Sequence, residues 1–223
     1  MKKQSLAAAF LAGALVLSSC GASNAVKGAG IGAAGGAGIG AGIGRVLGNT
    51  AVGAVIGGVV GGTAGTLIGK KMDKQKKELE RDVKDAKIES VNDGQAIRVT
   101  FDSGILFATG SASLSSTSQA TLRKFAANLS EHSDTDLMII GHTDNTGTDR
   151  VNNPLSYNRA ASVRSFLAGQ GVSSSRIKVE GKGSYEPVAD NSTAAGRREN
   201  RRVEVYILPS KEMVKAAQDG TLR

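Results

Sequence analysis

The strongest constraint on the fold is a glycine-rich segment between residues 28 and 69. In this segment 17 of 42 residues are glycine, and Arg45 carries the only charge. Glycine recurs at every fourth position, with one change of register just after Gly48. So much glycine disfavours a helix in water by about 1 kcal/mol per residue relative to alanine. A soluble helix is therefore not expected in this segment.

The same spacing suits helices in a bilayer, where glycine at every fourth residue lets two backbones approach closely. Two segments of about twenty residues also match the ~30 Å thickness of the hydrocarbon core. We therefore expect residues 28–69 to form a helical hairpin, and they resemble the glycine-zipper region of some outer-membrane lipoproteins. A flexible linker is the alternative, but linkers favour serine and threonine over the isoleucine and valine found here.

The N-terminus has the pattern of an export signal. Two lysines precede an apolar run over residues 6–17, which is too short to span a bilayer permanently. Cys20 is the only cysteine, so no internal disulfide can form. Residues 17–20 (LSSC) resemble the lipobox of bacterial lipoproteins, which implies that Cys20 is acylated and becomes the mature N-terminus. An inner-membrane retention signal would have aspartate at position 21, where this chain has Gly21. The resemblance therefore implies the outer membrane.

The charge balance points to anionic partners. The formal net charge is +8, and it becomes +6 once the two lysines of the signal are removed. A basic protein often binds nucleic acid, but export argues against that class of partner. We expect contact with anionic cell-wall polymer or lipid headgroups instead.

Residues 70–91 read as a charged helical connector. They are rich in lysine, glutamate and aspartate, and glycine and proline are absent from them. The pattern predicts a solvated helix that acts as a spacer. A self-associating coiled coil is the alternative, although only two or three heptads are available. Its thin apolar line consists of Met72, Leu79, Val83 and Ala86.

The pattern changes to that of a folded domain after Val91. A turn at residues 92–94 (NDG) precedes the first of four predicted strands. Two helices are expected between them, at residues 113–131 and from Pro154, with Asn153 as the N-cap of the second. This order predicts a two-layer α/β fold of the α+β type, with a mixed sheet and helices on one face. The strands are predicted at residues 97–101, 137–140, 177–180 and 203–207.

An acidic turn directly follows the apolar strand at 137–140. Asp144 lies in this turn, and ligands of open α/β sheets bind beyond the carboxyl ends of the strands. Arg159 follows on the next helix, beside its inner stripe, although a surface or locally paired arginine is the plainer interpretation. Arg201 has the parity of the core-facing residues of the last strand and needs an anionic partner, either Asp144 or a ligand carboxylate. Arg202 should point to solvent. Asp144 and Arg159 carry opposite charges on two different elements, which suits the binding of a small zwitterion.

Several short motifs together resemble, in order and spacing, the OmpA-like peptidoglycan-binding domain over roughly residues 95–208. The resemblance implies a βαβαββ order of elements. The motifs are residues 107–111 (FATGS), 141–147 (GHTDNTG), Asn152, and residues 155–160 (LSYNRA), 171–176 (GVSSSR), 181–183 (GKG) and 200–204 (NRRVE).

The resemblance implies a ligand, the meso-diaminopimelate side chain of uncrosslinked peptidoglycan stem peptides. Its free end carries an ammonium and a carboxylate on one carbon. Asp144 would take the ammonium, Arg159 would bind the carboxylate with two hydrogen bonds, and Arg201 would add positive charge. The other implied contacts are side-chain hydrogen bonds from Asn152 and Thr143 and backbone contacts around Thr109 and Gly110.

We considered catalysis as a different class of function. His142, Asp144 and Asp149 lie close in sequence, but the Cys/His spacing of zinc sites is absent. We also find no serine or cysteine nucleophile with a plausible base and orienting group. We therefore expect a protein that is not an enzyme and that uses no metal and no cofactor.

The sequence thus predicts an outer-membrane lipoprotein, with its C-terminal domain in the periplasm, that binds peptidoglycan and tethers the membrane to it. Its membrane contacts would be acylated Cys20 and the glycine-rich hairpin, and its protein partner would be a second copy or another envelope protein. The alternative is a glycine-zipper factor that inserts, oligomerises or alters permeability, with the wall domain only an anchor. The predicted parts are signal, lipidated N-terminus, hairpin, connector, OmpA-like domain and tail, at residues 1–19, 20–27, 28–69, 70–91, 92–210 and 211–223.

Overall fold

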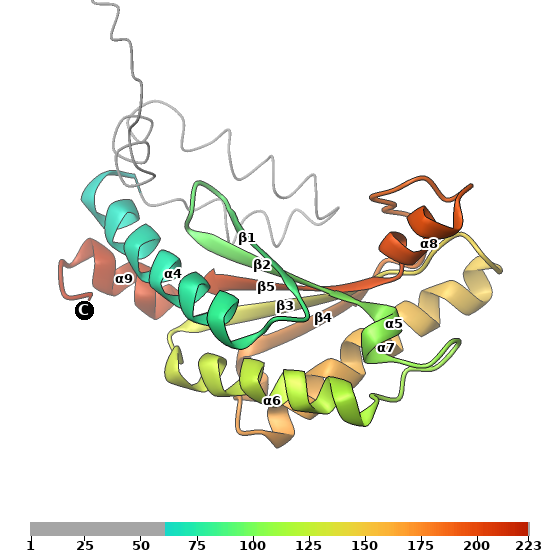
Figure 1. The fold of residues 1–223 in the computed structure, drawn as a ribbon. Coiled ribbons are helices and arrows are strands. Elements are labelled where there is room, and N and C mark those ends of the chain that lie inside the picture. The colour runs from blue at the N-terminus through green and yellow to red at the C-terminus, as the bar shows by residue number, and fades with distance from the viewer. Residues whose placement is uncertain (1–60, 223) are drawn as a thin grey trace, which may run out of the picture.

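A computed structural model describes residues 61–222, which fold around a five-stranded mixed sheet (Figure 1). The strands are β1 (Lys87–Val91), β2 (Ala96–Asp102), β3 (Thr135–Gly141), β4 (Ile177–Gly181) and β5 (Arg202–Pro209). The helices are α4 (Gly62–Asp82), α5 (Ser103–Leu106), α6 (Ser116–Glu131), α7 (Asp149–Gly169), the 3-10 turn η1 (Ser174–Arg176), α8 (Ala194–Asn200) and α9 (Lys211–Gln218).

The strand order is β1-β2-β5-β3-β4. Only β3 and β4 run parallel, with α7 as the crossover between them, and the other neighbours are antiparallel. The carboxyl end of β3 therefore lies beside the start of β5, where Gly141 pairs with Val203. The predicted mixed sheet is confirmed. The pairing of β3 with β5 brings the turn that contains Asp144 next to Arg201.

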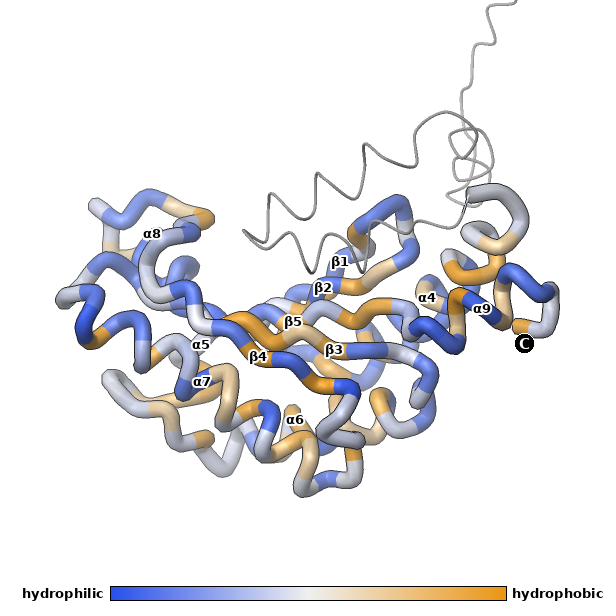
Figure 2. Tube along the Cα trace, turned by 180° about the vertical axis from the view of Figure 1, so that it is seen from behind, coloured by the Kyte–Doolittle hydropathy of each residue, from blue (hydrophilic) through white to orange (hydrophobic). Residues whose placement is uncertain are grey.

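The main core lies between the sheet and the helices α4, α6, α7 and α9 (Figures 1 and 2). Val203, Val205 and Ile207 of β5 are buried there, as are most apolar residues expected to face inward on the two helices, because their spacings place them on one face. Leu114 and Phe166 are only partly buried against this core. Phe101 of β2 and Phe125 of α6 meet edge to face at the centre, with ring centroids 5.6 Å apart. The expected helical layer is thus confirmed.

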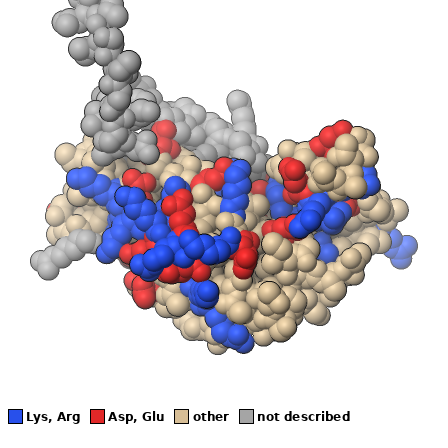
Figure 3. All heavy atoms as spheres, viewed as in Figure 1, with Lys and Arg blue, Asp and Glu red and all other residues tan. Residues whose placement is uncertain are grey.

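The charged segment is not a solvated spacer, because α4 packs on the domain along its whole length. Its buried line begins upstream at Ala64 and Ile68 and continues through Met72 and Leu79. Polar contacts to α6 and the residues after it include Gln75 Nε2 to Asn128 Oδ1 at 3.1 Å and Lys71 Nζ to Asp134 Oδ2 at 2.6 Å. Basic and acidic side chains are interleaved on the face seen in Figure 3. The charges of α4 thus cover its outer side while the apolar line joins the core.

The start of α4 also changes the expected end of the glycine-rich hairpin. Residues 62–69 were assigned to the hairpin, yet they form the first turns of α4, and Ala64 and Ile68 among them are buried in the main core. Among residues 61–222, none of the helices combines the length and apolar character that a bilayer crossing requires. The rest of the hairpin, the signal peptide and Cys20 lie outside the described residues.

Two further segments differ from the sequence-based expectation. The end of the expected connector is a strand, β1, which pairs with β2 across the predicted turn at residues 92–94. Asn92, Asp93 and Gly94 all have positive φ there, at 54°, 52° and 84°. The expected tail forms α9, whose Met213 is buried in the main core because it follows β5 directly.

Helix α7 begins at Asp149, one turn before the predicted start, so Pro154 lies inside it. The helix comes unusually close to the ends of β3 and β4. A Cβ at Gly141 would lie 2.0 Å from the Ser156 carbonyl oxygen, and one at Gly181 would lie 2.5 Å from the Tyr157 nitrogen. Only glycine allows this approach, which sets Arg159 beside the carboxyl ends of the strands.

Candidate ligand-binding site

Asp144 and Arg201 form an ion pair at the end of the sheet. Arg201 Nη1 lies 2.5 Å from Asp144 Oδ2, and the Thr146 backbone N–H donates to Asp144 Oδ1 at 2.8 Å. Asp144 is only 6% exposed, and its burial alone would raise its pKa. The hydrogen bonds from Arg201 and Thr146 outweigh burial and hold the pKa below its ordinary value. Asp144 is therefore a carboxylate at neutral pH.

Arg159 is a buried cation that approaches the same place from α7. It is 3% exposed, its Nε donates to the Ser111 carbonyl oxygen at 3.0 Å, and its guanidinium carbon lies 5.4 Å from the centre of the Phe107 ring. Burial, followed by the charge of Arg201, lowers its pKa, while Asp144 raises it. Arginine nevertheless stays protonated in proteins. Within residues 61–222, no carboxylate forms an ion pair with Arg159.

Asn152 and Thr143 are buried beside the turn. The Asn152 amide donates to the carbonyl oxygens of Asp144 and Thr146, at 3.3 and 3.2 Å, so it holds the turn from the side of α7. The Thr143 hydroxyl is buried without a hydrogen-bond partner in the described part of the chain. A ligand contact from either side chain stays a prediction.

Thr109 and Gly110 lie in the exposed turn between Phe107 and α6, where Gly110 has a φ of +69°. Because Arg159 binds the Ser111 carbonyl, this turn forms one wall beside the guanidinium. The structure thus brings Asp144, Arg159, Arg201 and the 109–110 turn to one end of the sheet. Sequence reasoning missed the direct contacts of Ser111 and Phe107 with Arg159, although both residues lie in the FATGS motif.

Arg202 is not solvated, and that expectation is wrong. It is buried at the start of β5, where its Nε donates to Glu204 Oε1 at 2.7 Å, and the Tyr206 hydroxyl donates to Glu204 Oε2 at 2.8 Å. The residues share one strand parity, so each finds its partner two positions along the same face. This face of β5 carries an internal ion pair in place of solvent-exposed charge.

His142 is also buried on this side, and its Nε2 lies 3.9 Å from Glu204 Oε2. Burial, followed by the nearby charge of Arg202, lowers the pKa of His142 to about 3, although Glu204 opposes the shift. The imidazole is therefore neutral at neutral pH and adds no positive charge to the site. Over residues 61–222, His, Cys, Asp and Glu form no group of three or more that could hold a metal ion.

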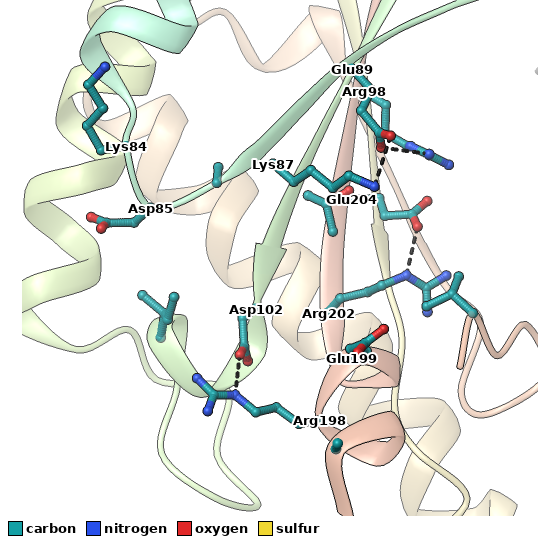
Figure 4. A pocket seen from close by; sticks show the side chains of 15 residues that line it. Lys84, Asp85, Lys87, Glu89, Arg98, Asp102, Arg198, Glu199, Arg202 and Glu204 are labelled. Carbon is teal, nitrogen blue, oxygen red and sulfur yellow. Dashed lines mark hydrogen bonds and ion pairs between the residues drawn. The ribbon is translucent and has the colours of Figure 1, made fainter. Parts of the chain in front are cut away.

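A cavity of about 840 Å³ lies over β1, β2 and β5, with α8 as one wall (Figure 4). Sequence analysis did not anticipate it. Several of its charges are paired within the protein, as the dashed lines in Figure 4 show, whereas Lys84, Asp85 and Glu199 are not among these pairs. The pairs are Glu89 with Lys87 and Arg98, Asp102 with Arg198, and Glu204 with Arg202. A ligand that bound Arg98, Arg198 or Arg202 would compete with these carboxylates, whereas Arg159 has no carboxylate partner within residues 61–222.

Known families match both ends of the chain. The model of the OmpA family matches residues 106–201, and that of the YMGG-like Gly-zipper matches residues 1–73. The chain is 38% identical over 138 residues to the Probable lipoprotein YiaD of Escherichia coli, which covers 62% of this chain and 63% of YiaD. It is 38% identical over 112 residues to the Peptidoglycan-binding protein ArfA of Mycobacterium tuberculosis, which covers 50% of this chain and 34% of ArfA. The chain thus spans less than two thirds of either relative.

A solved structure supports the same relationship. The cell wall anchor of the T6SS from Pseudomonas aeruginosa is 32% identical to this chain and superposes with a TM-score of 0.54. The similarity covers 60% of this chain and 96% of that one.

Proposed function

We propose, from the premise that the C-terminal domain of this chain belongs to the OmpA family, that it binds peptidoglycan non-covalently through meso-diaminopimelate. The chain would be an outer-membrane lipoprotein that tethers the membrane to the wall. ArfA is named for peptidoglycan binding and YiaD as a probable lipoprotein, which supports both parts of the proposal.

The observation that carries the proposal is the buried guanidinium of Arg159. A charge removed from water costs several kcal/mol unless an opposite charge and hydrogen bonds compensate it. Arg159 has one backbone carbonyl and one aromatic ring, and no carboxylate from residues 61–222. A ligand carboxylate that accepts two hydrogen bonds from its Nη groups would supply the missing partner.

Asp144 provides the opposite end of the clamp. Its oxygens accept hydrogen bonds from Arg201 and Thr146, and a carboxylate can accept about four hydrogen bonds. An ammonium group can therefore bind without displacing Arg201, whose charge keeps Asp144 ionised. Arg159 can bind a carboxylate and Asp144 can bind an ammonium group. Together they match a zwitterion, such as the free end of diaminopimelate.

The membrane end of the proposed tether is acylated Cys20 with the glycine-rich segment. The match to the YMGG-like Gly-zipper also supports the alternative of a membrane-inserting or oligomerising factor, and both roles can hold in one chain. Because α4 begins at Gly62, we propose that a glycine-rich hairpin would end at residue 61.

The proposal predicts that free meso-diaminopimelate releases the full chain from purified sacculi. Nα-acetyl-L-lysinamide is the matched competitor, because it keeps the ammonium at the end of the side chain but has no free carboxylate. It should release little protein, since it leaves Arg159 unpaired. The measurement is the bound fraction after sedimentation with an excess of either compound. Equal release by both, or by neither, would contradict the proposed ligand.

A further inference from the structure

The loop between β4 and α8, residues 182–193, contacts the Asp144 turn on both sides of the aspartate. The Thr143 backbone N–H donates to the Gly183 carbonyl oxygen at 2.8 Å, and the Asn145 backbone N–H donates to Asn191 Oδ1 at 3.3 Å. Residues 145–150 are exposed, so little packing fixes this turn. Its position therefore depends on such hydrogen bonds.

Asn191 receives its orientation from Asn200, which is fully buried at 0% exposure. Asn200 Oδ1 accepts the backbone N–H groups of Val188 and Ala189, at 2.8 and 3.0 Å. Its amide nitrogen must then face the other way, where it donates to the Ala189 carbonyl at 2.9 Å and to Asn191 Oδ1 at 2.8 Å. Asn191 thus presents an oxygen at this point, and the same oxygen accepts the Asn145 N–H.

This chain of hydrogen bonds runs beside the Asp144–Arg201 ion pair. Asn145 directly follows Asp144, and Asn200 directly precedes Arg201. The hydrogen bonds from both asparagines to Asn191 therefore join the two chain segments that carry the ion pair. The Arg201 side chain is 38% exposed, so water competes for its contact with Asp144. A second link between the same two segments would limit that competition.

We propose that Asn191 is a positioning residue, which holds the Asp144 turn against the Arg201 segment and so keeps Asp144 in the orientation that the ligand ammonium requires. The inference rests on the proposed function, because it concerns the same site. It assigns a role to the 182–193 loop, which otherwise only connects β4 to α8.

The test compares two substitutions at position 191 in the full chain. Asn191→Ala removes the shared oxygen, and we expect affinity for an uncrosslinked stem tripeptide ending in meso-diaminopimelate to fall about tenfold. Asn191→Asp keeps an acceptor for both N–H groups, so we expect affinity within about threefold of the wild type. Ser192→Ala is the matched control in the same loop, because within residues 61–222 the Ser192 hydroxyl bonds only to Asp190. Affinities are measured by titration calorimetry.

A second measurement separates positioning from a general loss of structure. In the unliganded Asn191→Ala protein, the pKa of Asp144 should move up towards its ordinary value, because the bonds from Arg201 and Thr146 are less often formed. Carboxyl NMR signals report this pKa directly. Wild-type affinity and an unmoved Asp144 pKa in Asn191→Ala would overturn the inference, as would equal losses in Asn191→Ala and Asn191→Asp.

The two proposals fail in different ways. If the folded wild-type chain does not bind the tripeptide, the proposed ligand is wrong, and the Asp144 pKa in the unliganded Asn191→Ala protein still decides whether Asn191 positions the turn. If the wild type binds and Asn191→Ala binds equally well with the same Asp144 pKa, only the positioning role is wrong.

Discussion

Replacing Arg159 with methionine is expected to abolish retention on sacculi while leaving the free energy of unfolding unchanged or higher. The lost bonds to a ligand carboxylate are charge-assisted, at about 1.5 to 3 kcal/mol each, so affinity should fall about 100-fold or more. Without ligand, Arg159 is a buried cation that lacks a described carboxylate partner. An apolar side chain of similar length removes that unfavourable charge, and such replacements are often neutral or stabilising.

Arg123 provides the matched control for this substitution. Its guanidinium carbon lies 6.0 Å from the centre of the Phe166 ring, so it makes the same kind of aromatic contact as Arg159, but it is exposed on α6. Arg123→Met should leave retention unchanged. Sedimentation with sacculi and urea unfolding measure the two effects. Full retention of Arg159→Met, or its unfolding under conditions where Arg123→Met is folded, would contradict the assigned role.

Replacing Leu79 with alanine should destabilise the domain by about 2–5 kcal/mol. Leu79 is fully buried on α4 and belongs to the main core, so its truncation leaves a cavity among packed side chains. A solvated spacer would show almost no effect at this position. The result therefore distinguishes a helix that belongs to the domain from one that only connects it to the membrane.

Lys77→Ala on the exposed side of the same helix is the control, with an expected change within about 0.5 kcal/mol. Both variants are compared with the wild type by urea unfolding of the full chain, followed by the signal of the β-sheet domain. Similar small effects of Leu79→Ala and Lys77→Ala would show that α4 does not contribute to the core.

Strands β2, β3, β4 and β5 were predictable because they alternate or run apolar over the residues that the structure pairs, whereas β1 lies in the segment that was assigned to the charged connector. The role of α4 was not predicted, because its inward line begins at Ala64 and Ile68, within a segment whose glycine content suggested a bilayer. Once Ile68 is added to Met72 and Leu79, the stripe is continuous and typical of a core-facing helix. The predicted boundary between the glycine-rich segment and the charged connector, between residues 69 and 70, divided this stripe in two.

The charged members of the site could be inferred, but their surroundings could not. Parity at the start of the last strand indicated that Arg201 meets either Asp144 or a ligand carboxylate, and the structure shows the contact with Asp144. The same reasoning failed for Arg202, because parity says which face a side chain takes and not whether a partner covers it. The bond between Asn145 and Asn191 joins residues 46 positions apart, and no local pattern predicts such a pairing.

The most direct test of the clamp is an NMR titration of meso-diaminopimelate into the isotopically labelled full chain. We predict saturable shifts of the Ser111, Thr143 and Thr146 backbone amides and of the Arg159 Nε–H group, because these groups surround the two charges. Saturable shifts confined to the cavity around Arg98 and Arg202, or no saturable shifts at all, would contradict the assignment of the zwitterion to Asp144 and Arg159.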